Sequence, residues 1–265
     1  VPVARPMVAG IAHAHERGHE VFELGVGYSG QLIPEGPPWQ VFSPHAYGRP
    51  EGQDCLFQLA NQLDVDAVFM LADVPDVSYL ANPTQYRDRR TGQGLKEDQI
   101  AHFDAGNFKR IAYTVIDGVC PNDRVPPEWS PMFRGLDGVA VATKWAADIV
   151  EKNCGVRPFY LPHSVDTSLF RPTDKALARS RFGIDPEAFV IFWAGVNRRR
   201  KMIPAAFETV AKFAKRTKAK KVLFWVHSYK VPETPYYDLQ ALADHYQLRD
   251  LEVMTIQTER LPEAA

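Results

Sequence analysis

The sequence has few cysteines, almost no net charge and no long apolar run. Its 265 residues include three cysteines, Cys55, Cys120 and Cys154, an odd set without Cys-x-x-Cys spacing. This argues against a disulfide framework and a zinc cluster, so we expect all three thiols to be packed in the interior. The 31 basic and 32 acidic residues leave a formal charge of -1, and no global field would attract nucleic acid or an anionic membrane. Any anion-binding site must therefore be local.

Sequence features that would direct the chain to a membrane are also missing. No apolar run approaches the length that spans a bilayer, and no charged-then-apolar leader precedes a small-residue cleavage site. We therefore expect a cytoplasmic protein without an integral membrane segment. The sequence starts at Val1 directly on a helical pattern and stops at Ala265 within a strand–helix series. We expect it to be truncated at both ends.

What the sequence does contain is 45% apolar residues, arranged as short buried strands that alternate with helical patterns. Strands are predicted at 21–26, 67–72, 110–115, 138–142 and 158–161, and again at 189–194, 222–226 and 251–256. Strands that are apolar throughout and alternate with helices indicate a parallel sheet covered on both faces. We therefore predict an α/β protein of two Rossmann-like, doubly wound parallel-sheet domains, of which the C-terminal one is incomplete.

The domain boundaries follow from a proline-rich stretch between the two series. Pro162, Pro172 and Pro186 surround one short predicted helix. We predict an N-terminal domain at residues 1–170, a linker at 171–187 and a partial C-terminal domain at 188–265.

Two long loops are predicted within the N-terminal domain. Residues 82–95 carry dense charge without periodicity, which is typical of a mobile surface loop, either a lid or a solvated insertion. A second, proline-rich loop is predicted from the end of the strand at residue 115 through Pro131.

Three stretches, in this order, carry a family resemblance. The first runs from Gly138 through Trp145 and contains a strand and the start of a helix. Residues 161–172 then read Leu-Pro-His-Ser-Val-Asp-Thr-Ser-Leu-Phe-Arg-Pro, and residues 195–201 read Gly-Val-Asn-Arg-Arg-Arg-Lys. The first stretch resembles the strand and helix start that precede the interdomain signature of family 4 glycosyltransferases. The other two resemble that signature, with Ser164 in the place of the usual glycine, and the family's donor-domain Arg-Lys loop. The resemblance implies the GT-B fold, in which two Rossmann-like domains face each other across a cleft.

The resemblance also implies a reaction. Family 4 members are glycosyltransferases, here of the hexosyltransferase type, that move a sugar from a UDP- or GDP-sugar to a hydroxyl acceptor with retention. It implies no catalytic metal and no cofactor apart from the nucleotide-sugar substrate, because a helix dipole and basic residues neutralise the departing diphosphate. The family's paired-glutamate motif is expected beyond Ala265, so this fragment alone is expected to be inactive.

Other functions remain open. A sugar-nucleotide epimerase of the same fold would act on the nucleotide-sugar without an acceptor, and a catalytically inactive relative would bind it as a module. A nucleic-acid binder is disfavoured, because the basic cluster at 198–201 is isolated in a neutral chain.

The basic residues at 198–201 lie between a buried strand and a helix predicted to start near Pro204. Free backbone N–H groups at a helix start, together with guanidinium groups, suit a diphosphate. The alternative interpretation is a solvated basic turn. With the resemblance, the predicted diphosphate-binding residues are Gly195, Asn197, Arg198, Arg200 and Lys201. Arg200 and Lys201 match the family motif best, and Arg198 and Arg199 are supporting candidates.

Polar residues outside this loop are also candidates. Asp117 follows a predicted parallel strand, where ligands gather, and the resemblance implies a catalytic contact with the reacting sugar or the acceptor hydroxyl. The alternative is an ordinary Asp-Gly turn in which Gly118 has a positive φ. His163 and Asp166 belong to the interdomain signature and are expected to shape a hinge with a polar face toward the cleft.

Two further groups of residues have weaker signals. Gln257 and Thr258 follow the last predicted strand, where the family offers backbone groups to the nucleotide base. The histidines at 13, 15 and 19 lie near a predicted helix end without a carboxylate or cysteine set. We expect these to be solvent-exposed histidines rather than a metal site.

Overall fold

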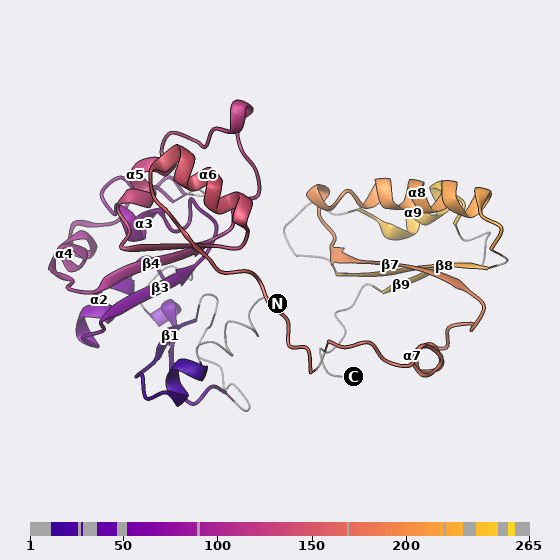
Figure 1. The fold of residues 1–265 in the computed structure, drawn as a ribbon, viewed down its shortest axis with the longest axis horizontal. Helices are drawn as coiled ribbons and strands as arrows, with labels where there is room; N and C mark the ends of the chain where they lie inside the picture. The colour runs from indigo at the N-terminus through magenta and orange to yellow at the C-terminus, as the bar shows by residue number, and fades with distance from the viewer. Residues whose placement is uncertain are drawn as a thin grey trace. The chain divides into compact units, whose positions relative to one another are not determined.

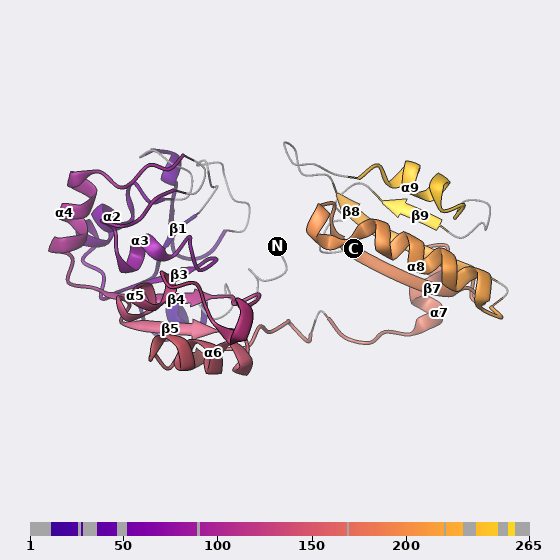
Figure 2. The same ribbon diagram turned by 90° about the horizontal axis from the view of Figure 1, so that it is seen from above.

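The computed structural model describes residues 12–25, 28, 36–46, 52–88, 91–168, 170–219, 221–229, 237–248 and 254–257. The chain divides into two compact units, Val1–Phe170 and Arg171–Ala265, called unit 1 and unit 2 below. Each unit is an α/β arrangement around parallel strands, as Figures 1 and 2 show. The predicted α/β class with Rossmann-like parallel sheets is therefore confirmed.

Unit 1 contains a four-stranded parallel sheet. In spatial order its strands are β3 (Ala67–Leu71), β4 (Lys109–Thr114), β5 (Gly138–Val141) and β6 (Phe159–Tyr160). Helices lie between successive strands, as parallel pairing requires: α3 (Ser78–Ala81), α4 (Glu97–Ala105), α5 (Trp129–Arg134) and α6 (Lys144–Cys154). A 3-10 turn, η2 (Pro121–Asp123), follows β4.

A separate two-stranded sheet also belongs to unit 1. Its strands, β1 (Phe22–Leu24) and β2 (Gln40–Phe42), are parallel, with Phe22 beside Gln40. Residues 12–16 are helical ahead of β1. After β2 come η1 (Pro44–Ala46) and α2 (Leu56–Gln62), which leads into β3.

Helix α6 shows how the sequence sets the bounds of an element in this unit. The Thr143 Oγ1 accepts a hydrogen bond from the Ala146 N–H at 3.0 Å, which caps the start of the helix. Gly155 ends it with a left-handed φ of 67 that other residues adopt at a cost. Its buried face includes Ile149 and Val150, which join the apolar core under the central strands.

Unit 2 contains a three-stranded parallel sheet of β7 (Phe189–Val196), β8 (Val222–Tyr229) and β9 (Met254–Gln257). Figure 1 shows α8 (Ile203–Arg216) and α9 (Leu239–His245) on one face of this sheet and α7 (Lys175–Arg181) on the other. The 3-10 turn η3 (Arg199–Lys201) joins β7 to α8. The core forms where the apolar face of α8 meets β8, and Phe207 packs edge-on against Phe224 with ring centroids 5.1 Å apart.

Both loop predictions are wrong in part. Tyr86, within the segment predicted as a mobile loop, is 5% exposed and packs against Tyr79 with ring centroids 5.4 Å apart. This contact attaches the segment to the core at Tyr86. Pro131 lies inside α5 rather than in a loop, because proline is tolerated in the first turn of a helix, where its missing N–H has no partner to lose.

Two further expectations concern thiols and membranes. Cys55 and Cys154 are buried, but Cys120 is exposed, so the prediction of three packed thiols is wrong for Cys120. Within the described residues, no helix has both the length and the apolar character needed to cross a membrane.

Candidate functional site

The carboxyl ends of the three strands of unit 2 meet at one edge of the sheet. In the register of the sheet, Ala194 of β7 lies beside His227 of β8, and His227 lies beside Gln257 of β9. The loop with the basic residues leaves the same edge directly after β7. Ligands of open parallel sheets bind outside the carboxyl ends of the strands, so this edge is the candidate site of unit 2.

Asn197 fixes the start of the basic loop. It is 1% exposed, and its Nδ2 donates to the Tyr237 carbonyl oxygen at 2.7 Å while its Oδ1 accepts from the Tyr237 N–H at 2.9 Å. The Gly195 carbonyl oxygen accepts from the Ser228 hydroxyl at 2.8 Å. Because the carboxamide of Asn197 is engaged with the backbone of Tyr237, it positions the loop. Direct contacts of Gly195 and Asn197 with a diphosphate stay a prediction.

The next four residues present positive charge to solvent. The Lys201 N–H donates to the Arg198 carbonyl oxygen at 3.0 Å, which closes η3. All four side chains of residues 198–201 are exposed. Across the part of the chain that the structure describes, none of them forms an ion pair with an acidic group. The loop is therefore a concentrated cationic surface in a protein whose formal charge is -1.

The backbone that follows brings a helix N-terminus to this surface. Met202 has a φ of 51, a left-handed conformation that is uncommon for a residue with a side chain. Met202 is 63% exposed, whereas Ile203, which starts α8, is completely buried. The first turn of α8 contains no acidic residue. The partial positive charge of the helix N-terminus thus adds to the field of the basic side chains.

Asp117 lies beyond the carboxyl end of β4 in unit 1. Its side chain is exposed, and no ion pair or side-chain hydrogen bond to it is found among the described residues. Gly118 does not adopt a positive φ, so the turn with a left-handed Gly118 is not the conformation present. The carboxylate of Asp117 is available to a ligand, and its catalytic role stays a prediction.

His163 is held by a buried tyrosine that sequence reasoning did not single out. Tyr113, near the end of β4, is 3% exposed, and burial raises the pKa of its phenol. Its Oη lies 2.9 Å from the Leu161 carbonyl oxygen and 3.0 Å from His163 Nδ1. Since the carbonyl can only accept, the hydroxyl donates to it and can accept from Nδ1–H. This arrangement leaves Nε2 of a neutral His163 as a hydrogen-bond acceptor.

Asp166 shapes the end of unit 1. Its Oδ1 accepts from the Ser168 N–H at 2.9 Å and from the Ser168 hydroxyl at 2.6 Å, and its carbonyl oxygen accepts from the Phe170 N–H at 2.8 Å. These bonds form a closed turn just before the boundary between the two units.

The remaining candidates are less informative. Thr258 lies outside the described residues, and for Gln257 the structure describes the backbone only. His13 and His19 are exposed, but His15 is half-buried, with its ring 6.2 Å from that of Trp39. No group of three or more His, Cys, Asp or Glu side chains able to hold a metal ion occurs within the described ranges.

Comparisons with known proteins add a resemblance of fold. No family model matches the chain, and no curated protein matches it. Among solved structures, the crystal structure of TarM is similar, with 13% identity and a TM-score of 0.43. The alignment covers 79% of this chain and 36% of the TarM chain, so the present chain spans little more than a third of that structure.

Proposed function

We propose that this chain is part of a nucleotide-sugar-dependent glycosyltransferase of the GT-B type. In this proposal unit 2 binds the diphosphate of a UDP- or GDP-sugar, and unit 1 contributes the groups that meet the hydroxyl acceptor. The reaction would retain the anomeric configuration. The motif resemblance at residues 161–172 and 195–201 suggested this function.

One observation carries the proposal. Residues 198–201 place four cationic side chains at the carboxyl edge of a parallel sheet and at the start of a 14-residue helix. Among the described residues, none of these side chains has an acidic partner. Like charges so close together repel one another, and a bound dianion would relieve that repulsion. Guanidinium and ammonium groups form strong charge-assisted hydrogen bonds with phosphate oxygens. A nucleoside diphosphate is therefore the ligand class that this edge suits best.

The chemistry follows from the charge. As the bond between sugar and diphosphate breaks, negative charge grows on the departing phosphate, and Arg200 and Lys201 would stabilise it more in the transition state than in the ground state. In this scheme the protein cations do the work that a catalytic metal does in other enzymes. Asn197 would keep the loop in place through Tyr237.

Calorimetric titration of UDP and of GDP into the protein tests the proposal. We expect Arg200→Ala and Lys201→Ala each to weaken binding on the order of tenfold to a hundredfold, since a charge-assisted contact contributes roughly 1.5–3 kcal/mol. Asn197→Ala should also weaken binding, because it releases the loop from Tyr237.

Arg216→Ala is the matched control. Arg216 is an exposed basic residue in the last turn of α8, at the opposite end of the helix from η3. Its loss removes one positive charge without touching the proposed site, so binding should be unchanged. Equal affinities for wild type, Arg200→Ala and Lys201→Ala would show that the cluster is only a solvated basic turn.

A further inference from the structure

The sequence contains two Asp-Gly pairs in nearly the same sequence context, and both belong to unit 1. Residues 116–119 read Ile-Asp-Gly-Val, and residues 136–139 read Leu-Asp-Gly-Val. Because the flanking residues are so alike, the two aspartates should have nearly the same intrinsic reactivity in an unfolded chain. Any difference between them in the folded protein therefore comes from the structure around each pair.

An aspartate followed by glycine can rearrange without an enzyme or an oxidant. The glycine amide nitrogen attacks the side-chain carboxyl carbon, and the nitrogen's proton and the carboxyl hydroxyl leave together as water, which gives a cyclic imide. Glycine favours this attack because it has no side chain to shield its nitrogen. Water then opens the imide. Attack at the side-chain carbonyl restores aspartate, whereas attack at the main-chain carbonyl gives isoaspartate, in which the main chain runs through the former side chain.

Asp117 and Gly118 meet the requirements of this reaction in the folded protein. They lie between β4 and η2, outside any helix or strand, and both are exposed. Within the described ranges, the Asp117 side chain makes no hydrogen bond or ion pair, and the Gly118 N–H donates no hydrogen bond. A Cβ built on Gly118 would meet nothing within 4 Å. The attacking nitrogen and the carboxyl carbon are therefore free to approach each other.

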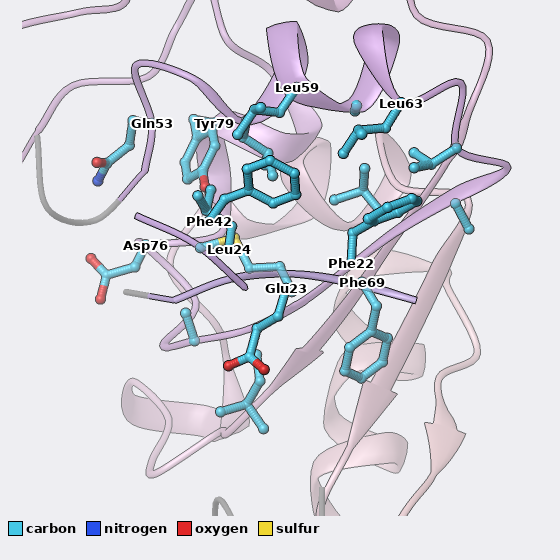
Figure 3. Close-up of a pocket in the computed structure, with 18 of the residues that line it drawn as sticks. Phe22, Glu23, Leu24, Phe42, Gln53, Leu59, Leu63, Phe69, Asp76 and Tyr79 are labelled. Carbon is cyan, nitrogen blue, oxygen red and sulfur yellow. The ribbon is translucent and has the colours of Figure 1, made fainter. Parts of the chain in front are cut away.

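The pair also lies outside the cavity of unit 1. Figure 3 shows this cavity, of about 620 Å³, with Phe22 of β1, Leu59 of α2 and Phe69 of β3 among its lining residues. Neither Asp117 nor Gly118 is one of the described residues that line it. Since both are exposed, the water that opens the imide reaches them directly from bulk solvent.

Asp137 is held by several hydrogen bonds. Its Oδ2 accepts from the Arg110 N–H at 2.9 Å, and its Oδ1 accepts from the Lys109 ammonium at 3.3 Å. Its own N–H donates to the Arg110 carbonyl oxygen at 2.9 Å. Gly138 is the first residue of β5 and lies beside Ile111 of β4, where an added Cβ would come within 3.4 Å of the Ile111 side chain. The Asp137 carboxyl cannot turn toward the Gly138 nitrogen without breaking these bonds.

The charge state of Asp137 acts in the same direction. The carboxyl loses its hydroxyl when water leaves, so the protonated carboxyl is the reactive form. Hydrogen bonds from the Arg110 N–H and from Lys109 lower the pKa of Asp137, because they stabilise the carboxylate. A lower pKa leaves a smaller fraction of this group protonated at neutral pH. Geometry and charge thus both protect the second pair.

We propose that Asp117-Gly118 is a site of spontaneous isoaspartate formation in the folded protein, whereas Asp137-Gly138 is protected from it. The product has one additional carbon atom in the main chain between β4 and η2, and its free carboxylate is attached to the α-carbon. In the proposed glycosyltransferase, Asp117 meets the reacting sugar or the acceptor hydroxyl, so the rearrangement would remove that group. This consequence rests on the proposed function, but the rearrangement itself does not.

The test incubates the full chain at neutral pH in water enriched in heavy oxygen. Each opening of the imide introduces one heavy oxygen atom, whichever product forms. Digestion with trypsin in ordinary water then places the two pairs in separate peptides, residues 111–124 and residues 135–144. Fragmentation in the mass spectrometer locates the heavy oxygen and distinguishes isoaspartate from aspartate.

Two controls separate structure from sequence. The same incubation in denaturing urea removes the folded structure from both pairs. Gly118→Ala is the matched variant, because its methyl group shields the attacking nitrogen. Alanine fits at this position, since Gly118 does not have a positive φ and the space around it is open.

We expect Asp117 to incorporate heavy oxygen about tenfold or more faster than Asp137 in the folded protein, because Asp137 can react only when β5 opens locally. In urea the two rates should be equal, and Gly118→Ala should slow incorporation at Asp117 alone. Equal rates in the folded protein would overturn the proposal, as would label at Asp117 in urea only. The same ratio in urea would also overturn it, since sequence context would then explain the difference. Nucleotide binding is not measured here, so the proposed function and this inference can fail separately.

Discussion

The buried contact between Tyr113 and the chain that leaves β6 makes a testable prediction for a single residue. Replacing Tyr113 by phenylalanine removes the hydroxyl that contacts the Leu161 carbonyl oxygen and His163 Nδ1. We expect the free energy of unfolding to fall by about 1 kcal/mol, the usual contribution of one such hydrogen bond. Urea unfolding measures this change, and the NMR chemical shifts of the His163 ring should change, because its Nδ1 has lost its partner.

Tyr160→Phe is the control for this change. Tyr160 is 48% exposed, and its hydroxyl makes no hydrogen bond within the described part of the chain. Its loss should leave both the unfolding free energy and the chemical shifts of the His163 ring as in wild type. If Tyr113→Phe behaves like Tyr160→Phe, the Tyr113 hydroxyl does not hold His163 in solution.

Burial of Tyr113 also makes stability depend on pH. Desolvation raises the pKa of this phenol above its usual value of 10.0, so the folded state keeps its proton at a pH where the unfolded state releases it. The corresponding stability is present below pH 10 and is lost as pH rises toward the folded-state pKa. We expect wild type to lose stability above about pH 10 and Tyr113→Phe to lose less over the same range. Identical pH profiles for the two proteins would contradict this assignment.

The residues of the candidate site differ in how far the sequence could predict them. The basic cluster at 198–201 is contiguous and follows an apolar strand, so its exposure at a strand end could be predicted. The clamp on Asn197 could not, because its partner Tyr237 is 40 residues away. Tyr113 and His163 are likewise 50 residues apart, and only the parallel register of unit 1 brings them together.

At the scale of elements, the start of α6 provides the clearest prediction. Thr143→Ala removes the side-chain oxygen that accepts from the Ala146 N–H at 3.0 Å. We expect a loss of about 1 kcal/mol in the free energy of unfolding, as for other N-cap substitutions. Thr143→Ser keeps the hydroxyl and should restore most of this loss in chemical denaturation. Equal destabilisation by alanine and serine would mean that the Thr143 methyl group, rather than the hydrogen bond of its hydroxyl, stabilises the helix.

The elements that could be predicted are those with a long enough pattern. The runs that became β3, β4, β5, β7 and β8 are mostly apolar and alternate with helical patterns, and the sequence shows both features. The missed elements are β2, of three residues, and α3, of four. Segments this short do not contain enough residues to show a strand or helix pattern in the sequence, so tertiary contacts decide their conformation. Helix α5 was missed because Pro131 was taken for a loop residue.

At the scale of the whole molecule, the apolar interior is divided. The clusters around Phe133 and Phe57 belong to unit 1, whereas the cluster around Phe207 belongs to unit 2. No described residue of the two clusters in unit 1 also belongs to the cluster in unit 2. A domain with its own core can unfold by itself, so the two units need not behave as one cooperative structure.

A pair of matched core substitutions tests whether the two units unfold separately. Phe133 and Phe207 are both completely buried, one in the core of each unit. Replacing either by alanine should cost about 3–5 kcal/mol, because it removes a buried ring and leaves a cavity. We expect native-state hydrogen exchange to show lost protection only in β3 to β6 for Phe133→Ala and only in β7 and β8 for Phe207→Ala. Equal loss of protection in both units from either variant would contradict separate cores, since only a single cooperative structure spreads the cost of one cavity across both.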